Sequence, residues 1–346
     1  MEKIRLGIIG IGRMGITHYS IINEHPRIQI VAVVEPSQVI VGFLRKFVRS
    51  LNVYSDYKQL FKKELLDAII VCTPPGLNHS VILEAGRKGI AVFAEKPFVV
   101  KKAEALELTT LFSQNKIVNQ VGYVNRFNDI FIKVKEMVEL HLIGEIISFK
   151  SEMNSRTILK PSNDASGWRS SPTTGGGALF EIGSHAIDLI VYFLGKPDKV
   201  VGSFMKKIYS KNVEDAVVST FLYKDGMVGT LNINWSDESY RKPSNQIELF
   251  GTFGKIIANQ YGIKLFLKEG KEKMGYKAGW NSVYITDVFK PVPFYVRGNE
   301  FTAQLYHFVE CVLDNSIKNI CSFTDAVSTL EVIENINNDF MNNGKL

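Results

Sequence analysis

A glycine-rich turn near the N-terminus constrains the fold more than any other feature of this sequence. The turn comprises Gly10, Ile11, Gly12, Arg13, Met14 and Gly15, which form a G-x-G-x-x-G pattern. An apolar run at Ile4–Ile9 precedes it, and an amphipathic stretch follows it. In a strand–turn–helix unit, the first glycine permits the tight turn, the second admits a pyrophosphate, and the third lets the helix pack closely. The helix N-terminus attracts the phosphates. The pattern therefore predicts that these six residues bind a dinucleotide.

An acidic residue bears on which dinucleotide binds. Glu35 ends the second apolar run, about twenty residues after Gly15, where a carboxylate can accept the ribose hydroxyls of adenosine. The same carboxylate would repel a 2′-phosphate. The residues that follow are Pro36, Ser37 and Gln38, so no arginine stands ready to neutralise one. The sequence predicts NAD as the cofactor in preference to NADP.

The first third of the chain alternates strand and helix signals. Apolar runs at 4–9, 28–34, 66–72, 91–94 and 117–121 predict strands, and the stretches 39–48, 79–88 and 101–114 predict helices. This alternation, with strands that are mostly apolar, is typical of a parallel sheet covered on both faces. Residues 1–122 are therefore predicted to form an α/β, doubly wound Rossmann domain.

After residue 122 the pattern changes. Strand candidates at 145–153, 200–208, 216–223, 227–234 and 246–250 are joined by turns, and helices are predicted at 178–194, 300–313 and 324–340. Asp225-Gly226 is a hairpin signal between two of the strands. We expect residues 123–346 to form an α+β domain with a mostly antiparallel sheet, which binds substrate and mediates oligomerisation. The last helices are free to pack back on the Rossmann domain.

Composition narrows the class of protein further. Apolar residues make up 45 % and charged residues 22 % of the 346, which fits a folded chain of two domains. No apolar run reaches the roughly 18 to 20 residues of a membrane span. Three widely spaced cysteines suit reduced thiols, and the net charge of +6 comes from scattered residues. We expect a cytoplasmic protein that binds no metal, nucleic acid or membrane.

Two places carry residues suited to proton transfer. Lys96 follows the fourth predicted strand, so it should lie at the carboxyl edge of the sheet, where open parallel sheets bind ligands. A lysine there can donate a hydrogen bond to a substrate oxygen. The predicted helix after the three glycines at 175–177 has an apolar face and a polar stripe formed by Glu181, His185, Asp188 and Tyr192. A stripe facing water is the alternative interpretation. The triple glycine would allow close approach of a ligand.

Together these motifs resemble the Gfo/Idh/MocA family of oxidoreductases, nearly from end to end. The resemblance is carried by the glycine turn, Thr73-Pro74-Pro75 with His79, Glu95-Lys96-Pro97, the stretches 122–127 and 167–169, and above all 175–188. It implies a hydride transfer between nicotinamide and a carbon of a sugar or cyclitol. It also implies that Lys96 and His185 handle the hydroxyl proton, with Glu181 orienting the imidazole.

The resemblance assigns further residues. The cofactor would contact Thr73, Pro74, His79, Glu95, Lys96, Trp168 and Arg169, and the substrate would contact Tyr123, Arg126 and Asp188. One departure stands out, because the family usually has Asp where this chain has Glu181. The extra methylene moves the carboxylate by roughly an ångström, whereas catalytic sites tolerate about half of that.

The sequence thus predicts an NAD-preferring dehydrogenase or reductase that acts on the CH–OH group of a small sugar-like substrate. We expect it to form a homo-oligomer, a dimer or tetramer, through the open face of its second sheet. Two alternatives stay open. One is a non-catalytic dinucleotide sensor, and the other is a lyase or glycosidase that uses bound NAD only transiently.

Overall fold

The computed structural model describes residues 3–47, 51–161 and 168–343. The chain divides into two compact units. The first comprises 1–124 with 291–327, and the second comprises 125–290 with 328–346. Each unit is therefore assembled from two separate stretches of sequence, and the chain crosses from one unit to the other more than once.

The first unit is built on a six-stranded parallel sheet. Its strands are β1 (Ile4–Ile9), β2 (Ile28–Val34), β3 (Asn52–Tyr54), β4 (Ala68–Val71), β5 (Ala91–Ala94) and β6 (Asn119–Val121), in the order β3-β2-β1-β4-β5-β6. Every residue of β4 and β5 is buried, as a parallel sheet covered on both faces requires. The predicted Rossmann fold is confirmed, and the strand order reverses between β1 and β4, which is where such sheets bind ligands.

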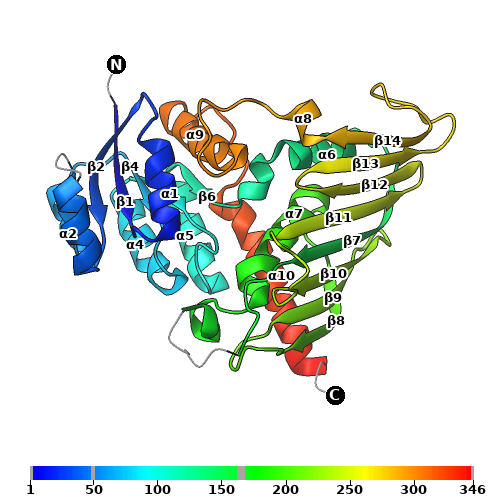
Figure 1. The fold of residues 1–346 in the computed structure, drawn as a ribbon, viewed down its shortest axis with the longest axis horizontal. Helices are drawn as coiled ribbons and strands as arrows, with labels where there is room; N and C mark the ends of the chain where they lie inside the picture. The colour runs from blue at the N-terminus through cyan, green and yellow to red at the C-terminus, as the bar shows by residue number, and fades with distance from the viewer. Residues whose placement is uncertain (1–2, 48–50, 162–167, 344–346) are drawn as a thin grey trace. The chain divides into compact units, whose positions relative to one another are not determined.

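Helices cover this sheet. They are α1 (Arg13–Ile22), α2 (Gln38–Phe47), α3 (Tyr57–Lys63), α4 (Pro75–Arg87), α5 (Lys102–Gln114) and α9 (Asn299–Leu313). α4 packs beside α5, and α9, from late in the chain, packs beside α1 (Figure 1). Leu305, Phe308 and Val309 of α9 join the same buried cluster as Ile8 and Phe93. A helix made near the end of the chain thus completes the core of the Rossmann sheet.

The second unit contains a mostly antiparallel sheet, as predicted. Its eight strands are β7 (Ile146–Asn154), β8 (Lys199–Lys206), β9 (Ala216–Leu222), β10 (Val228–Asn234), β11 (Ser244–Gly251), β12 (Gly254–Asn259), β13 (Gly262–Leu267) and β14 (Gly279–Tyr284). The order is β14-β13-β12-β11-β7-β10-β9-β8, and only β7 and β10 pair in parallel. Three of these strands, β12, β13 and β14, are not among those predicted from the sequence. Each has six residues and opens on a glycine, and β14 buries only Val283, so the alternation in each is too short to stand out.

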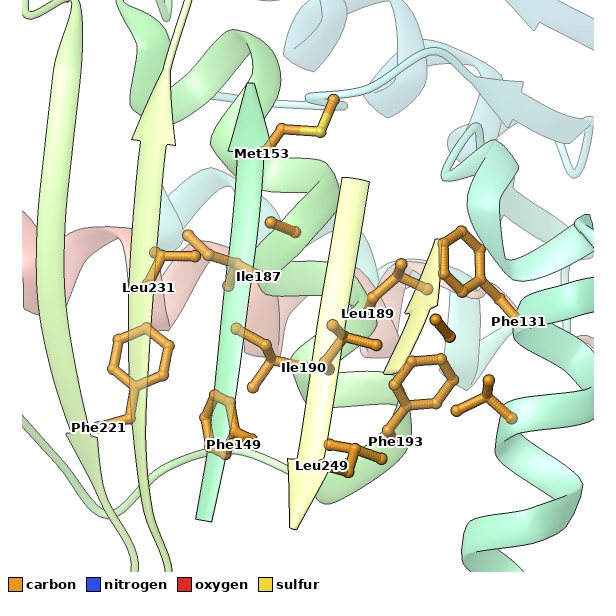
Figure 2. Close-up of a cluster of buried hydrophobic side chains, with 14 of the residues drawn as sticks. Phe131, Phe149, Met153, Ile187, Leu189, Ile190, Phe193, Phe221, Leu231 and Leu249 are labelled. Carbon is orange, nitrogen blue, oxygen red and sulfur yellow. The ribbon is translucent and has the colours of Figure 1, made fainter. Parts of the chain in front are cut away.

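One face of this sheet carries the core. α6 (Asp129–Glu139), α7 (Ser184–Leu194) and much of α10 (Phe323–Asn343) contribute buried side chains to it, and the short α8 (Ile285–Val288) packs at its margin. Figure 2 shows Ile187 and Ile190 of α7 lying among Phe149, Leu231 and Phe221 of the strands. The segment Pro172–Leu194, which includes α7, is long and apolar enough to cross a membrane by length and composition alone, but 67 % of its most apolar 18 residues are buried. Burial of this kind is what a core helix under a sheet requires.

The opposite face of the sheet is mixed in character. At its centre Lys255 and Glu248 form an ion pair of 2.7 Å, and cross-strand register places Lys150 beside Glu248. Toward β14 the face becomes aromatic, with Trp280 and Tyr284 about 60 % exposed. The centre of the face is therefore charged and its β14 side is aromatic. Homo-oligomer formation through this face stays a prediction.

Candidate active site

The glycine-rich turn lies between β1 and α1. Gly10 has φ +91°, and a Cβ atom there would lie 2.8 Å from the Cys72 carbonyl oxygen. A Cβ on Gly15 would overlap the Gly10 carbonyl, so only glycine lets α1 sit this close to the strand. A Cβ on Gly12 would meet nothing within 4 Å, so this backbone faces open space. No side chain caps the N-terminus of α1, which fits a site that leaves its N–H groups for phosphates.

Glu35 is tied to this turn. Its Oε2 accepts a hydrogen bond of 3.0 Å from the Ile11 N–H, and its Oε1 accepts one of 3.0 Å from the Ser37 N–H. The side chain is nearly buried, with 8 % of the residue exposed. A carboxylate has about four acceptor positions, so two bonds to the backbone leave capacity for ribose hydroxyls. Glu35 therefore has a role that the sequence analysis did not foresee, since it holds the end of β2 against the glycine turn.

The ends of β4 and β5 bring several predicted residues to the same edge of the sheet. Thr73 follows β4 and donates a 2.6 Å hydrogen bond to the Asn78 side chain. Pro74 is the exposed N-cap residue that precedes α4, and His79 pairs with Glu107 of α5 at 2.9 Å. Because β4 pairs in parallel with β1 and β5 pairs in parallel with β4, their carboxyl ends lie at the edge that carries the glycine turn.

Glu95 and Lys96 follow β5 directly. The Glu95 carboxylate is bonded to His18 of α1, with 2.6 Å between Oε1 and Nε2. Burial and, to a lesser degree, this carboxylate raise the pKa of the nearby Cys72 thiol. Cys72 therefore stays a thiol at neutral pH and offers no nucleophile at this edge. Lys96 is partly buried, and it is the side chain here best suited to hold a proton near a substrate oxygen.

In the second unit, two of the three glycines make room for other parts of the chain itself. Gly177 has φ +105°, and a Cβ on it would overlap the Glu214 carboxylate. A Cβ on Gly176 would overlap the Arg169 carbonyl. The close approach that these glycines permit is thus to the chain itself. Glu214 accepts the Leu179 N–H at 2.9 Å, and burial raises the pKa of Glu214 even though this hydrogen bond lowers it.

The helix that follows begins as a π-helix over Leu179–Gly183 and continues as α7. A continuous α-helix was predicted over 178–194, so the π turn at its start is a correction. Such π turns occur often at functional sites. Glu181 lies inside the π turn, and His185 lies in the first turn of α7, both partly buried. Asp188 is fully buried. Asp188 therefore faces protein, and the alternative of a stripe in water is wrong for this residue.

Arg126 and Asp188 form a buried ion pair. The Arg126 Nε lies 3.0 Å from Oδ2 and its Nη2 lies 2.8 Å from Oδ1. Arg126 is 2 % exposed and Asp188 is not exposed, while the Tyr192 ring lies 4.9 Å from the guanidinium carbon and Thr329 donates to Asp188 at 3.4 Å. The pair joins the short helix η1 (Val124–Phe127) to α7. Tyr123, the third predicted substrate residue, belongs to the first unit and is 1 % exposed.

Glu181 pairs with Arg169. The carboxylate Oε1 lies 3.1 Å from both Nε and Nη2 of the guanidinium, which also stacks 4.6 Å from the Trp168 ring. Arg169 and Trp168 belong to the short helix η2 (Trp168–Ser170), and Gly167 lies outside the described residues. The longer side chain of Glu181 thus reaches an arginine.

Three buried or half-buried polar residues were not singled out from the sequence, namely His18, Asn78 and Glu214. The helical periodicity of α1 would have placed His18 on the same face as Gly15.

A Rossmann sheet with an open glycine turn, a lysine at its carboxyl edge and a second antiparallel sheet define an NAD-binding oxidoreductase of two parts. Two family models match the chain. One, described as the NAD-binding Rossmann fold of the GFO/IDH/MocA oxidoreductase family, matches residues 4–123, and the other, described as the GFO/IDH/MocA C-terminal domain, matches residues 131–257. The chain belongs to the GFO/IDH/MocA family.

Individual relatives are distant. An uncharacterized oxidoreductase of Schizosaccharomyces pombe is 26 % identical over 65 % of this chain, and the match spans 62 % of its own length. The scyllo-inositol 2-dehydrogenase (NAD(+)) of Bacillus subtilis is 23 % identical over 99 % of this chain and 95 % of its own. Levoglucosan dehydrogenase, solved in complex with NADH and levoglucosan, has a TM-score of 0.85 and 19 % identity, with 99 % of this chain and 98 % of that chain covered.

Proposed function

We propose that this protein transfers a hydride between the nicotinamide of NAD and a CH–OH carbon of a sugar, a sugar derivative or a cyclitol. The observation that carries the proposal is the position of Lys96 at the carboxyl end of β5, on the sheet edge that also holds the open glycine turn. Relatives named for inositol and a fold neighbour solved with an anhydrosugar support the substrate class.

The residues have distinct proposed roles. The Lys96 ammonium donates a hydrogen bond to the reacting oxygen and polarises it, and His185 accepts the hydroxyl proton in the oxidative direction. Glu35 and the glycine turn hold the adenosine and pyrophosphate parts of the dinucleotide. When bound, the nicotinamide supplies the hydride acceptor. Arg126 and Asp188 are hydrogen-bonded to one another, so we propose that they hold α7 in place, in addition to any contact with substrate.

A screen of sugars, inositols and anhydrosugars for NADH absorbance tests the proposal. At least one compound should give net NADH with turnover proportional to enzyme concentration. Substrate conversion without net NADH would identify a lyase or glycosidase that uses NAD transiently. NAD binding with no conversion of any compound in either direction would identify a dinucleotide sensor. Either of these outcomes overturns the proposal.

Glu35 should set the preference for NAD over NADP. A carboxylate next to a 2′-phosphate is repelled by about 1–3 kcal/mol at a largely buried site, which corresponds to about ten- to a hundredfold in affinity. Calorimetry should therefore give tighter binding of NAD(H) than of NADP(H), and Glu35→Ala should reduce the ratio of the two dissociation constants. Glu35→Gln is the matched control, because it keeps an acceptor for the Ile11 N–H and removes only the charge. Equal affinities in the unmodified protein would contradict this assignment.

Glu181 should affect substrate choice more than rate. Glu181→Asp shortens the acid and withdraws it from Arg169, whose partly exposed pairing contributes less than about 1 kcal/mol to stability. We expect kcat to change by less than about tenfold, while the ratio of kcat/KM between two sugar substrates changes more. Glu181→Gln, which keeps the length and removes the charge, serves as the comparison. A large fall in kcat with unchanged preference would instead place residue 181 in proton transfer.

A further inference from the structure

We infer that His18 is a positioning residue for Lys96 and acts through the Glu95 carboxylate. The inference rests on the proposed function, because it assumes that Lys96 meets the substrate oxygen. His18 lies on α1, on the same helix face as Gly15, and Glu95 follows β5. The two residues are 77 positions apart in the sequence, and their side chains meet below the sheet edge that carries Lys96.

The contact between His18 and Glu95 is short and enclosed. The His18 Nε2 and the Glu95 Oε1 are 2.6 Å apart, and His18 has no exposed surface. The imidazole and the Phe93 ring pack in a T-shaped arrangement with 5.2 Å between centroids, which restricts rotation of the imidazole. Since a carboxylate only accepts hydrogen bonds, Nε2 carries the proton in this contact. The other ring nitrogen, Nδ1, is buried and has no hydrogen-bond partner in the part of the chain that the structure describes.

The Glu95 carboxylate in turn holds the backbone of Lys96. Its Oε2 accepts the Lys96 N–H at 3.2 Å, so one carboxylate joins α1 to the residue that bears the proposed catalytic amine. Gly122 closes the third side, since a Cβ there would lie 3.3 Å from the carboxyl atoms. With His18, Gly122 and its own strand around it, the carboxylate has little freedom to rotate, and the Lys96 N–H is held with it.

A second support reaches the other side of Lys96. Asn78 of α4 accepts a 2.6 Å hydrogen bond from Thr73 and donates one of 3.4 Å to the Pro97 carbonyl. Asn78 is 1 % exposed. The backbone is therefore held before and after the Lys96 side chain, at the Lys96 N–H by the Glu95 carboxylate that His18 of α1 contacts, and at the Pro97 carbonyl by Asn78 of α4. Apolar residues of similar shape would fill these positions at little cost to stability, so the polar groups are better explained by placement, because a 1 Å displacement of a catalytic group costs about a hundredfold in rate.

Two substitutions at position 18 separate placement from packing. His18→Met fills the volume and removes the donor, and His18→Gln keeps an amide N–H near the place of Nε2. We expect His18→Met to lower kcat by about 10- to 100-fold with KM and the NAD dissociation constant within about threefold. His18→Gln should recover kcat to within about fivefold of the unmodified enzyme. Equal kcat values for the two variants would overturn the inference.

A double-mutant cycle tests whether His18 acts through Lys96. In a Lys96→Ala background, His18→Met should lower the residual turnover by less than about threefold, because the positioned amine is gone. A loss in that background as large as in the unmodified enzyme would show that His18 acts on the fold and would overturn the inference. If His18→Met does not fold, the pair His18→Leu with Glu95→Met removes both buried polar groups, and it should fold and show the same loss of kcat.

A measurement without turnover separates this inference from the proposed function. Reductive methylation with ¹³C-formaldehyde gives each lysine an NMR signal, and the Lys96 signal is identified by its absence in Lys96→Arg. We expect this signal to move in His18→Met and to stay in place in His18→Gln. If it does so while no sugar is oxidised, positioning holds and the proposed function fails. If the signal is the same in both variants, the inference fails whatever the enzyme does.

Discussion

Replacing Lys96 by alanine should lower kcat by about 10²- to 10⁴-fold, the usual contribution of a positioned acid or base. His185→Ala should lower it by a similar factor. The dissociation constant for NAD should stay within about threefold in both variants, because the pyrophosphate and adenosine contacts proposed for the glycine turn and Glu35 involve neither side chain. Steady-state kinetics and calorimetry on the same preparations measure the two quantities.

Exposed residues of the same type provide the controls. Lys101 lies close to Lys96 in sequence, its side chain is 74 % exposed, and it pairs only at the surface with Glu104. His141, with 70 % of its side chain exposed, serves the same purpose for His185. Alanine at either control position should leave kcat unchanged. If Lys96→Ala and His185→Ala behave like these controls, the assignment of the proton-transfer residues is wrong.

The second large effect is expected on stability. Asp188→Ala should lower the free energy of unfolding by about 3–5 kcal/mol, because it leaves the buried Arg126 guanidinium without its carboxylate. For a unit of this size the corresponding fall in Tm is about 6–20 °C. Calorimetry or circular dichroism with temperature would measure it. A Tm within about 2 °C of the unmodified protein would mean that the pair is not needed for the fold.

A compensating variant tests whether this pair also contacts substrate. Arg126→Met together with Asp188→Leu replaces both charges by apolar groups, which is often neutral for stability. We expect the double variant to regain most of the lost Tm. If it then also regains kcat/KM, the pair only holds η1 to α7. If Tm returns and KM remains raised, the pair contacts substrate as the family resemblance implies.

The parts of the fold that follow a local period could be predicted from the sequence. The bounds of β1 and β2 agree with the apolar runs, since strands that bury most of their residues leave a nearly continuous apolar signal. The roles of Gly10 and Gly15 could also be predicted, because strand, turn and helix are contiguous. The π turn at Leu179–Gly183 could not, because a projection at one fixed period has no means of detecting an extra residue in a single turn.

The partners of the site residues could not be predicted from local sequence patterns. The His18 side chain is hydrogen-bonded to Glu95, and the Arg126 side chain is hydrogen-bonded to Asp188, 62 positions away in the sequence. Such contacts depend on how the helices pack on the sheet, which the local pattern of a single sequence does not encode. The triple glycine shows the same limit. Three glycines in a row indicate that some group approaches the backbone closely, but they do not identify that group, which for Gly177 is the chain's own Glu214.

The placement of α9 has a consequence for how the protein is made. During synthesis the N-terminal sheet leaves the ribosome first, yet Phe308 and its neighbours on α9, which complete its core, emerge only after the whole antiparallel sheet. Until then the apolar face that receives α9 is open to water and to other chains. Domains generally fold as units from the N-terminus during translation, so this chain departs from that order. The nascent chain therefore exposes an apolar surface that a chaperone can shield. Removing the C-terminal segment that contains α9 would leave this surface permanently exposed.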